Sequence, residues 1–232
     1  MKIHKHVSLI IIISALLFVR AYSQQYQPTN VAVTTSGAQS ETAIAVDPNH
    51  PNHLMATWND FTNSQAQYQP GYSFSTDGGN TWSAAQTFNF TGFDPSCAID
   101  KAGREYYTYG TKFNGGDEIT GPIKISYSIT NGPPWSSYQI SSLSTHQDKP
   151  YMTVDNTGGN NDGRVYISWT DLDIQNNTTK IKFRSAFIQD NVFSLSNEYT
   201  IATKSSITPI PFSYIAFKPD STPTPTGSGS FV

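Results

Sequence analysis

The chain has 232 residues, of which 13% are charged and 13% aromatic, and its formal net charge is −3. A weakly acidic chain with scattered lysines lacks the basic patch that nucleic-acid binding requires, so no nucleic-acid partner is expected. The single cysteine, Cys97, excludes an internal disulfide framework, and its apolar context "PSCAID" favours a buried core residue over a nucleophilic thiol.

The first 23 residues predict a secretory signal peptide. Lys2 and Lys5 give a positive start, Ser8–Phe18 is a continuous apolar run, and "AYS" places small residues before Gln24. The alternative is an uncleaved anchor, but the run is shorter than the ~20 apolar residues that span a bilayer. We therefore expect a secreted, extracellular or periplasmic protein with no membrane span after cleavage.

Three stretches of the remaining chain share one pattern. Each has an acidic opening, a short apolar strand that ends in Asp, a polar turn and an aromatic-rich strand; they are Glu41–Asp60, Asp94–Phe113 and Asp148–Asp171. The strand-ending residues Asp47, Asp100 and Asp155 are 53 and 55 residues apart. Regular spacing of this kind indicates an internal structural repeat.

The second half of each unit repeats as well. Ser75 and Trp82 recur 53 residues later as Ser128 and Trp135, and Ile181–Ser194 is a weaker third copy with Ser185 in the serine place. A unit of 53 to 57 residues with four short strands predicts an all-β fold of four-stranded antiparallel β-propeller blades; an all-β sandwich is the alternative. The predicted domain covers 24–232, with repeats at about 40–93, 94–147 and 148–210 and a partial one at 211–232.

The octapeptide "STDGGNTW" has a local structural task for each of its characteristic residues. Asp77 can accept hydrogen bonds from nearby backbone N–H groups, and Gly79 allows positive φ. Thr81 can bond back across the turn, Trp82 can cover the hairpin, and Ser75 is the first residue of the pattern. We interpret these five residues as a structural turn rather than a catalytic loop.

This octapeptide resembles the Asp box, or bacterial neuraminidase repeat, of secreted sialidase-like propellers. The match is complete at Ser75, Asp77, Gly79, Thr81 and Trp82, and the flanking strands resemble blade strands of that family over most of 40–202. The resemblance implies a six-bladed propeller with the box on its rim. The same box occurs in propellers that cleave xyloglucan and in sorting receptors, so it indicates a fold better than a reaction.

The resemblance also implies what a sialidase site would contain: three arginines that clamp the substrate carboxylate, an Asp acid/base and a Tyr–Glu nucleophile pair. After the signal peptide the chain has only Arg104, Arg164 and Arg184, in turn-like or outer-strand contexts, and it lacks the F/Y-R-I-P motif. No family catalytic residue can be carried over to this sequence.

A weaker set of candidate site residues consists of Glu41, Asp94 and Asp148, which open the first strand of each repeat. If those strands line the propeller axis, the carboxylates meet at one mouth, where they could serve glycoside hydrolysis or hold a cation. The alternative is that each bonds within its own blade. No metal or other cofactor is expected; calcium in Asp155–Gly163 is an alternative, although that loop lacks calcium-loop spacing.

Two functions remain open from the sequence. The first is a secreted sialidase-like propeller that binds or formerly hydrolysed glycans, with glycans or glycoproteins as partners; any enzyme activity would be that of an exo-alpha-sialidase-like glycoside hydrolase. The alternative is a non-catalytic extracellular protein-interaction module.

The last stretch, Ser213–Val232, begins another repeat, because "IAFKP" at Ile215–Pro219 resembles "IAVDP" at Ile44–Pro48. About three and a half blades are therefore expected, and we predict an N-terminal fragment of a longer propeller. The alternative is a natural short protein with a flexible tail.

Overall fold

The structure, a computed structural model, describes residues 30–35, 37–61, 69–88, 90–111, 121–142, 146–189 and 192–206, and the backbone of 217–218 and 230–231. The predicted signal peptide at 1–23 and most of the predicted repeat at 211–232 lie outside the described residues. The chain divides into two units, Met1–Val31 and Ala32–Val232, and the architecture below belongs to the second unit.

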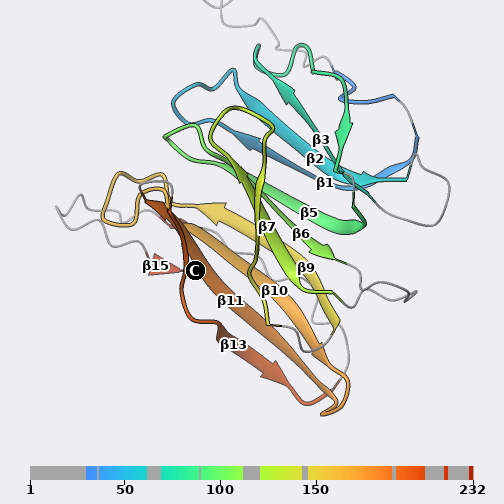
Figure 1. Cartoon of the computed structure of the whole chain (residues 1–232), viewed down its shortest axis with the longest axis vertical. Helices are drawn as coiled ribbons and strands as arrows, with labels where there is room; N and C mark the ends of the chain where they lie inside the picture. The colour runs from blue at the N-terminus through green and yellow to red at the C-terminus, as the bar shows by residue number, and fades with distance from the viewer. Residues whose placement is uncertain are drawn as a thin grey trace, which may run out of the picture. The chain divides into compact units, whose positions relative to one another are not determined.

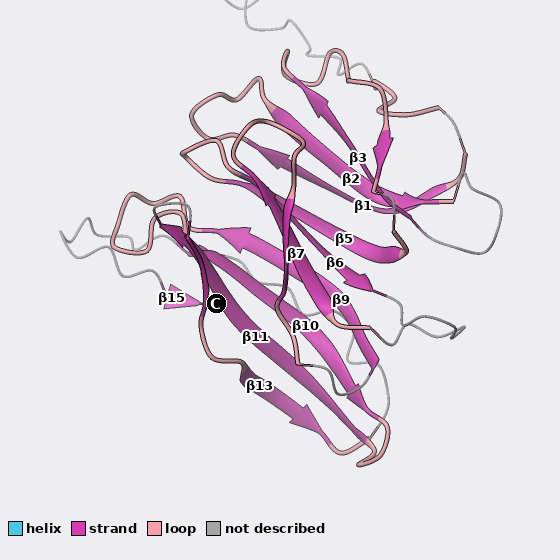
Figure 2. Cartoon of the chain, viewed as in Figure 1, coloured by secondary structure: helices cyan, strands magenta, loops and turns pink. Residues whose placement is uncertain are grey.

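Within the described residues the chain is all-β, and Figure 2 shows strands and loops without a helix. No helix with the length and apolar character of a membrane crossing occurs in that part of the chain. The described strands form antiparallel sheets that follow one another along the sequence as blades of a β-propeller (Figure 1). The fold class predicted from the repeat is therefore confirmed.

The first two blades are four-stranded sheets in which sequence neighbours pair. The first blade, in the order β1-β2-β3-β4, consists of β1 (Gln39–Val46), β2 (Leu54–Asp60), β3 (Gln69–Ser75) and β4 (Gln86–Thr87). The second blade, in the order β5-β6-β7-β8, consists of β5 (Gly92–Ile99), β6 (Glu105–Thr111), β7 (Ile123–Ser128) and β8 (Ser136–Gln139).

The third blade departs from the predicted four strands. Its strands are β9 (His146–Val154), β10 (Val165–Asp173), β11 (Thr178–Gln189), β12 (Val192–Leu195) and β13 (Tyr199–Lys204). Because β11 has 12 residues, its outer edge accommodates two strands: Thr179–Phe183 pairs with β13 and Ala186–Gln189 pairs with β12. A separate two-stranded pair is formed by β14 (Phe217–Lys218) and β15 (Ser230–Phe231).

The turn after the first strand of each blade is closed by the strand-ending aspartate. Asp47, Asp100 and Asp155 are at most 3% exposed. Each carboxylate accepts a hydrogen bond from the backbone N–H two residues later, at 2.8 to 2.9 Å; the donors are Asn49, Ala102 and Thr157. This Asx-turn geometry explains why an aspartate recurs at the same place in all three blades.

Apolar cores lie between neighbouring blades, with β5 beside both β1 and β9 (Figure 1). The core between the first and second blades includes Met55, Tyr72, Phe88, Cys97, Ile99, Tyr107 and Tyr109. The core between the second and third includes Ala98, Tyr106, Ile123, Ile125, Met152, Ile167 and Trp169. Cys97 is thus a buried core residue, and burial raises the pKa of its thiol to about 12, which keeps it protonated.

Candidate functional site

The first strand of each blade contains a β-bulge, in which two residues stand opposite one residue of the second strand. Among the described residues only five non-glycine residues have positive φ, and three of them are the first bulged residues. These are Glu41, Asp94 and Lys149, with φ of 52°, 51° and 50°. The three blades therefore place a charged side chain on the same unusual backbone conformation.

A non-glycine residue in the left-handed region costs about 1–3 kcal/mol and persists only where the surroundings hold it there. At Glu41, Asp94 and Lys149 the conformation is held by the strand pairing on both sides of the bulge. The following residue is Pro95 in the second blade and Pro150 in the third, which fixes the next φ angle. Conformations of this kind concentrate at ligand-binding and catalytic sites, so the three bulges are candidates for a functional site.

The three bulged side chains come together in what we call the bulge cluster: Glu41, Asn59, Asp94, Asp148 and Lys149. Lys149 Nζ forms ion pairs with the Glu41 carboxylate and, at 3.0 Å, with Asp94 Oδ2. The Asn59 amide of β2 donates to Glu41 Oε2 and Asp94 Oδ1, both at 3.3 Å. The Asp94 backbone N–H donates to Asn59 Oδ1 at 2.8 Å, so residues of all three blades are tied at one point.

Asp148 precedes the bulged lysine and faces Asp94. Burial, followed by its hydrogen bond with the Asp94 side chain and the charge of Asp94, raises the pKa of Asp148 to about 6; Lys149 opposes this rise. The carboxyl of Asp148 can therefore hold a proton in mildly acidic solution.

Two hollows adjoin the bulge cluster. One, of about 280 Å³, lies over the bulges themselves and has apolar walls from Pro95, Pro150 and Tyr151. The other, of about 220 Å³, lies between Asn59, Asp148 and the rings of Phe61 and Phe93. Glu41, Asp94 and Lys149 line both hollows, so charged groups and apolar walls face the same space.

The structure places two of the three sequence candidates, Glu41 and Asp94, at equivalent positions. The third equivalent position is held by Lys149, and Asp148 is one residue earlier, paired with Thr170 of β10. Sequence reasoning missed Lys149. Counting back six residues from each strand-ending aspartate reaches Glu41, Asp94 and Lys149, and this count would have found it.

The octapeptide Ser75–Trp82 forms a turn closed by its own hydrogen bonds. Asp77 accepts from Ser75 Oγ and the Thr81 N–H, both at 2.8 Å, and from Thr81 Oγ1 at 2.6 Å. The Gly79 N–H donates to Ser75 Oγ at 2.8 Å, and Gly79 has φ of 90° beside the Trp82 ring. The bonds from Thr81 and Ser75 lower the pKa of Asp77 to about 2, so the turn is closed by a carboxylate over most of the pH range.

The three arginines that follow the predicted signal peptide are engaged away from the bulge cluster. Arg104 pairs with Asp100 at 2.6 Å and donates to the Ile188 carbonyl of the third blade. Arg164 donates to Asn161 and Ser185 and lies over the Phe187 ring. Arg184 donates to the carbonyls of Ile140 and Ser196. Of the described residues that line the two hollows, Lys149 is the one cation.

The loop Asp155–Gly163 is closed by internal hydrogen bonds. Asp155 Oδ1 accepts from Thr157, and Asp162 Oδ1 accepts from the Gly158 N–H at 2.7 Å and lies 3.6 Å from Lys101 Nζ. Among the described residues, no group of three or more His, Cys, Asp or Glu side chains is arranged to hold a metal ion.

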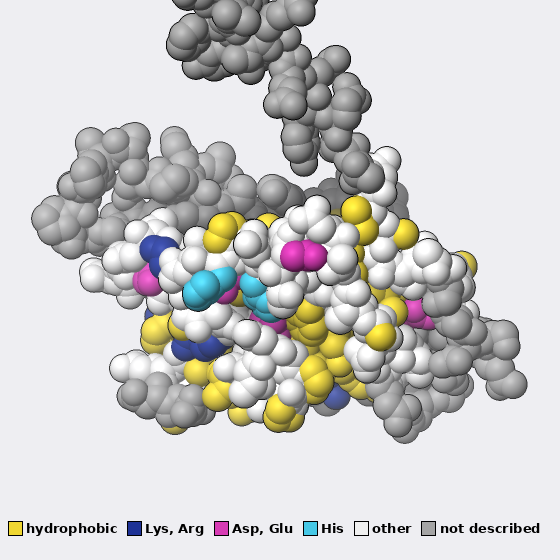
Figure 3. All heavy atoms as spheres, turned by 90° about the horizontal axis from the view of Figure 1, so that it is seen from above, with side chains coloured by type: hydrophobic (Ala, Val, Ile, Leu, Met, Phe, Trp, Pro, Cys, Tyr) yellow, Lys and Arg dark blue, Asp and Glu magenta, His cyan; other side chains and the backbone are white. Residues whose placement is uncertain are grey.

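Figure 3 shows histidine side chains beside acidic ones on one face of the molecule. His50 lies 3.1 Å from Asp47 within one turn, whereas His53 Nε2 lies 2.8 Å from Oε1 of the fully buried Glu105 in the second blade. Burial raises the pKa of Glu105, and the contact with His53 opposes that rise. The His53–Glu105 pair ties the first blade to the second and does not line the two hollows.

No protein-family model and no curated protein matches the chain. Among solved structures, it is similar to a protein of unknown function from Dyadobacter fermentans DSM 18053 (13% identity, TM-score 0.46, 68% of this chain and 54% of that one). It is also similar to a GH43 endo-arabinanase from Bacillus licheniformis, with 17% identity and a TM-score of 0.40 over 63% of this chain and 51% of that one. A third similar structure is an alpha-L-arabinanase of Penicillium chrysogenum complexed with arabinobiose, with 18% identity and a TM-score of 0.35 over 56% of this chain and 38% of that one. The chain thus spans about half the length of the first two.

Proposed function

We propose that the chain is a secreted, sialidase-like Asp-box propeller that binds carbohydrate at the bulge cluster and does not hydrolyse it. The observation that carries this proposal is the convergence of Glu41, Asp94 and Lys149, each held on a strained backbone, at hollows shared by three blades. Strain at three equivalent positions is retained where the side chains have a task that a relaxed residue would not perform.

The chemistry of the two hollows suits a sugar. The carboxylates of Glu41 and Asp94 and the amide of Asn59 can form hydrogen bonds with vicinal hydroxyls. Each carboxylate oxygen can accept a further hydrogen bond in addition to the one from its present partner. Pro95, Pro150 and Tyr151 offer apolar walls for the carbon faces of a sugar ring. Ligand pockets combine these two features, a mainly apolar lining and a few placed polar groups.

The charge of the bulge cluster favours a neutral sugar over sialic acid. Lys149 is already shared by Glu41 and Asp94, and Asp148 adds a third carboxyl group. A ligand carboxylate would meet like charge without the arginine clamp that bidentate recognition requires. We therefore expect binding of uncharged glycans and no sialidase activity.

Hydrolysis is disfavoured by how close two of the carboxyl groups lie. Glycoside hydrolases hold their carboxyl pair about 5–5.5 Å or about 6.5–9.5 Å apart, whereas Asp94 and Asp148 are in hydrogen-bond contact. Two carboxyl groups in hydrogen-bond contact leave no room for a sugar or a water molecule between them.

A glycan array with the purified chain, followed by calorimetric titration of the best neutral hit, tests the proposal. We expect Glu41→Gln to weaken binding about tenfold, or about 1.4 kcal/mol. The matched control, Asp173→Asn, removes a carboxylate from the β10–β11 turn, where it pairs with Lys180 at 3.1 Å, and should bind normally.

Failure of every neutral glycan to bind would contradict the proposal and favour the protein-interaction module. Binding that survives Glu41→Gln unchanged would place the glycan elsewhere on the molecule. Release of sialic acid from a fluorogenic sialoside would contradict both the charge argument and the absence of catalysis.

A further inference from the structure

The two hollows beside the bulge cluster share three charged residues and differ in the rest of their described lining. Glu41, Asp94 and Lys149 line both of them. The hollow of about 280 Å³, here called the proline hollow, is completed by Thr42, Ala43, Pro95, Pro150 and Tyr151. The hollow of about 220 Å³, here called the phenylalanine hollow, is completed by Ser40, Asn59, Phe61, Phe93 and Asp148. The three shared residues therefore lie at the border where the two spaces adjoin.

The volume of each hollow suits one sugar unit. Pockets for drug-sized molecules have volumes of about 300–1,000 Å³. Each hollow alone is below that range, whereas the two together are within it. A single sugar residue is smaller than a drug-sized molecule and matches one hollow, so a ligand that fills both hollows has two units.

The border between the hollows offers polar groups to the link between two units. Lys149 Nζ has three N–H donors, of which one is engaged by Glu41 and one by Asp94, the latter at 3.0 Å. The third can donate to a glycosidic oxygen or to a hydroxyl beside it. On the side of the phenylalanine hollow, the Asn59 amide adds a further polar group, held by its bonds to Glu41 and Asp94.

Each hollow also has an aromatic ring that can lie against the carbon face of a sugar. Phe61, directly after β2, is 38% exposed in the phenylalanine hollow. Tyr151 of β9 is half-buried and lines the proline hollow together with Pro95 and Pro150. The two rings belong to different blades, so each hollow has an apolar wall of its own.

We propose that the ligand of the bulge cluster is a neutral oligosaccharide recognised through two adjacent sugar units, one in each hollow. This inference rests on the proposed carbohydrate binding and adds to it the size of the recognised unit. The link between the units crosses the border at Glu41, Asp94 and Lys149, where one ammonium group and two carboxylates face the hydroxyls on either side. A monosaccharide fills one hollow only and should bind more weakly.

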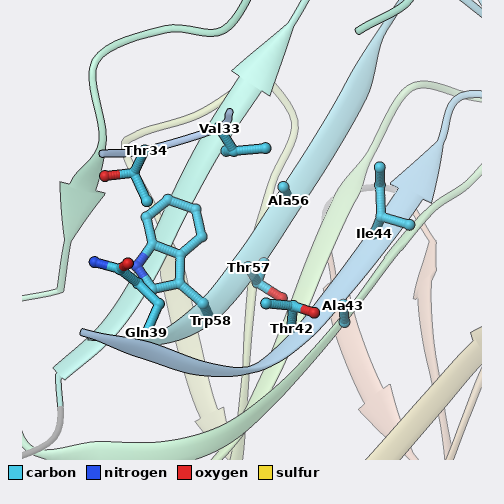
Figure 4. Close-up of a pocket in the computed structure, with 9 residues that line it drawn as sticks. All are labelled: Val33, Thr34, Gln39, Thr42, Ala43, Ile44, Ala56, Thr57 and Trp58. Atoms are coloured by element: carbon cyan, nitrogen blue, oxygen red, sulfur yellow. The ribbon is translucent and has the colours of Figure 1, made fainter. Parts of the chain in front are cut away.

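A third hollow, of about 440 Å³, lies on the first blade and provides a control (Figure 4). In the view of Figure 4 the Trp58 indole and the Ile44 side chain lie on opposite sides of it. Its described lining is uncharged and includes no residue of the bulge cluster. This hollow has an aromatic wall and sufficient volume, but it lacks the charged border that the proposal requires.

Calorimetric titration of the purified full chain with the monosaccharide, disaccharide and trisaccharide of the best neutral glycan tests the proposal. We expect the disaccharide to bind at least about tenfold more tightly than the monosaccharide, because the second unit adds contacts in its own hollow. The trisaccharide should bind within about twofold of the disaccharide, because its third unit lies outside both hollows.

Two substitutions each remove one aromatic wall. Phe61→Ala and Tyr151→Ala should both weaken the disaccharide about tenfold, whereas only one of them should weaken the monosaccharide, since a single ring occupies one hollow. Ile44→Ala is the matched control, because it removes an apolar side chain that is 60% exposed from the hollow of Figure 4, and it should bind both sugars normally. Thermal melting checks folding, and Tyr151→Leu replaces Tyr151→Ala if the latter unfolds.

A disaccharide that binds no more tightly than its monosaccharide would overturn the two-unit proposal and leave carbohydrate binding itself in place. A trisaccharide with a further gain of the same size would overturn it as well, because a third unit would then be recognised. Weaker disaccharide binding in Ile44→Ala would place the second unit in the hollow of Figure 4 and so contradict the assigned hollows. Failure of all three sugars to bind would instead contradict the proposed function.

Discussion

Two groups of acidic residues in this protein differ in how far along the chain their partners lie. Asp77 and Asp100 bond mainly to groups two to six residues away in the sequence. Glu41 and Asp94 bond to Asn59 and Lys149, which are 18 to 108 residues away from them. The local acids close turns inside one blade, whereas the bulge cluster holds three blades together around two hollows.

The difference shows which contacts of a repeat protein are complete within one repeat and which need several repeats. A turn closed by its own aspartate is complete within one repeat and can recur in each of them. A site made of one side chain from each blade exists only after the blades have packed, and its members can differ, as Glu41, Asp94 and Lys149 do. The following substitutions test this division.

Removing a buried local acid should have the largest effect. Asp100 is 0% exposed and accepts from Arg104, Tyr106 and two backbone N–H groups. Asp100→Ala leaves these donors without their acceptor, and we expect a loss of about 3 kcal/mol in the free energy of unfolding. Urea denaturation measures it. Asp100→Asn keeps one acceptor oxygen, so its free energy of unfolding should lie between those of the wild type and Asp100→Ala. A loss below about 1 kcal/mol for Asp100→Ala would show that the carboxylate does not stabilise the turn.

Removing the shared cation of the bulge cluster should cost less. Lys149→Met leaves Glu41 and Asp94 as neighbouring carboxylates, and we expect a loss of about 1–2 kcal/mol because the pairs are partly exposed. The matched control is Lys180→Met, since the Lys180 and Lys149 side chains are 28% and 25% exposed and, among the described residues, Lys180 forms an ion pair with Asp173 within one blade. Equal losses in the two variants would mean that joining three blades adds nothing to stability.

Asp148 provides a pH-dependent test of the same cluster. Its pKa is raised to about 6 in the folded chain, so between about pH 4 and pH 6 the native state keeps a proton that the unfolded chain has released. This contribution to stability is fully present below about pH 4 and is lost as the pH rises through 6. Asp148→Asn should therefore raise stability at pH 7 by about 1 kcal/mol, after allowance for solvent screening, and leave it unchanged at pH 4.

Denaturation of Asp148→Asn at both pH values, with Asp173→Asn as the control, measures this effect. A stabilisation that is the same at pH 4 and pH 7 would show that Asp148 does not titrate in this range.

The smallest effect is expected at the exposed turn of the octapeptide Ser75–Trp82. Asp77→Asn weakens the bonds from Thr81 and should lower the melting temperature slightly, with faster hydrogen exchange at the Thr81 amide as the more direct measurement. Because the pKa of Asp77 is lowered to about 2, its contribution is present above about pH 4 and is lost as the pH falls through 2. Loss of glycan binding in this variant would contradict the separation of the turn from the site.

Much of the fold could be predicted because its signals are local. The strand-ending aspartates and the residues of the Asp box bond within a few positions of themselves, so their spacing revealed both the repeat and the four-stranded unit. The bulge cluster was predicted in part: Glu41 and Asp94 were assigned to one mouth. Lys149 was not predicted from the sequence, because the acidic residues that open the repeats point to Asp148, whereas the packed blades bring together opposite charges.

The sequence by itself determined the all-β class, the length of the repeating unit and the aspartates that close its turns, since these depend on hydrogen bonds between near neighbours and on alternating apolar residues. Only the tertiary structure decided that Lys149 joins Glu41 and Asp94 and that the Asp148 carboxyl group faces that of Asp94. These features arise from the packing of blade against blade, where Coulomb attraction and burial act between residues that are far apart in the chain.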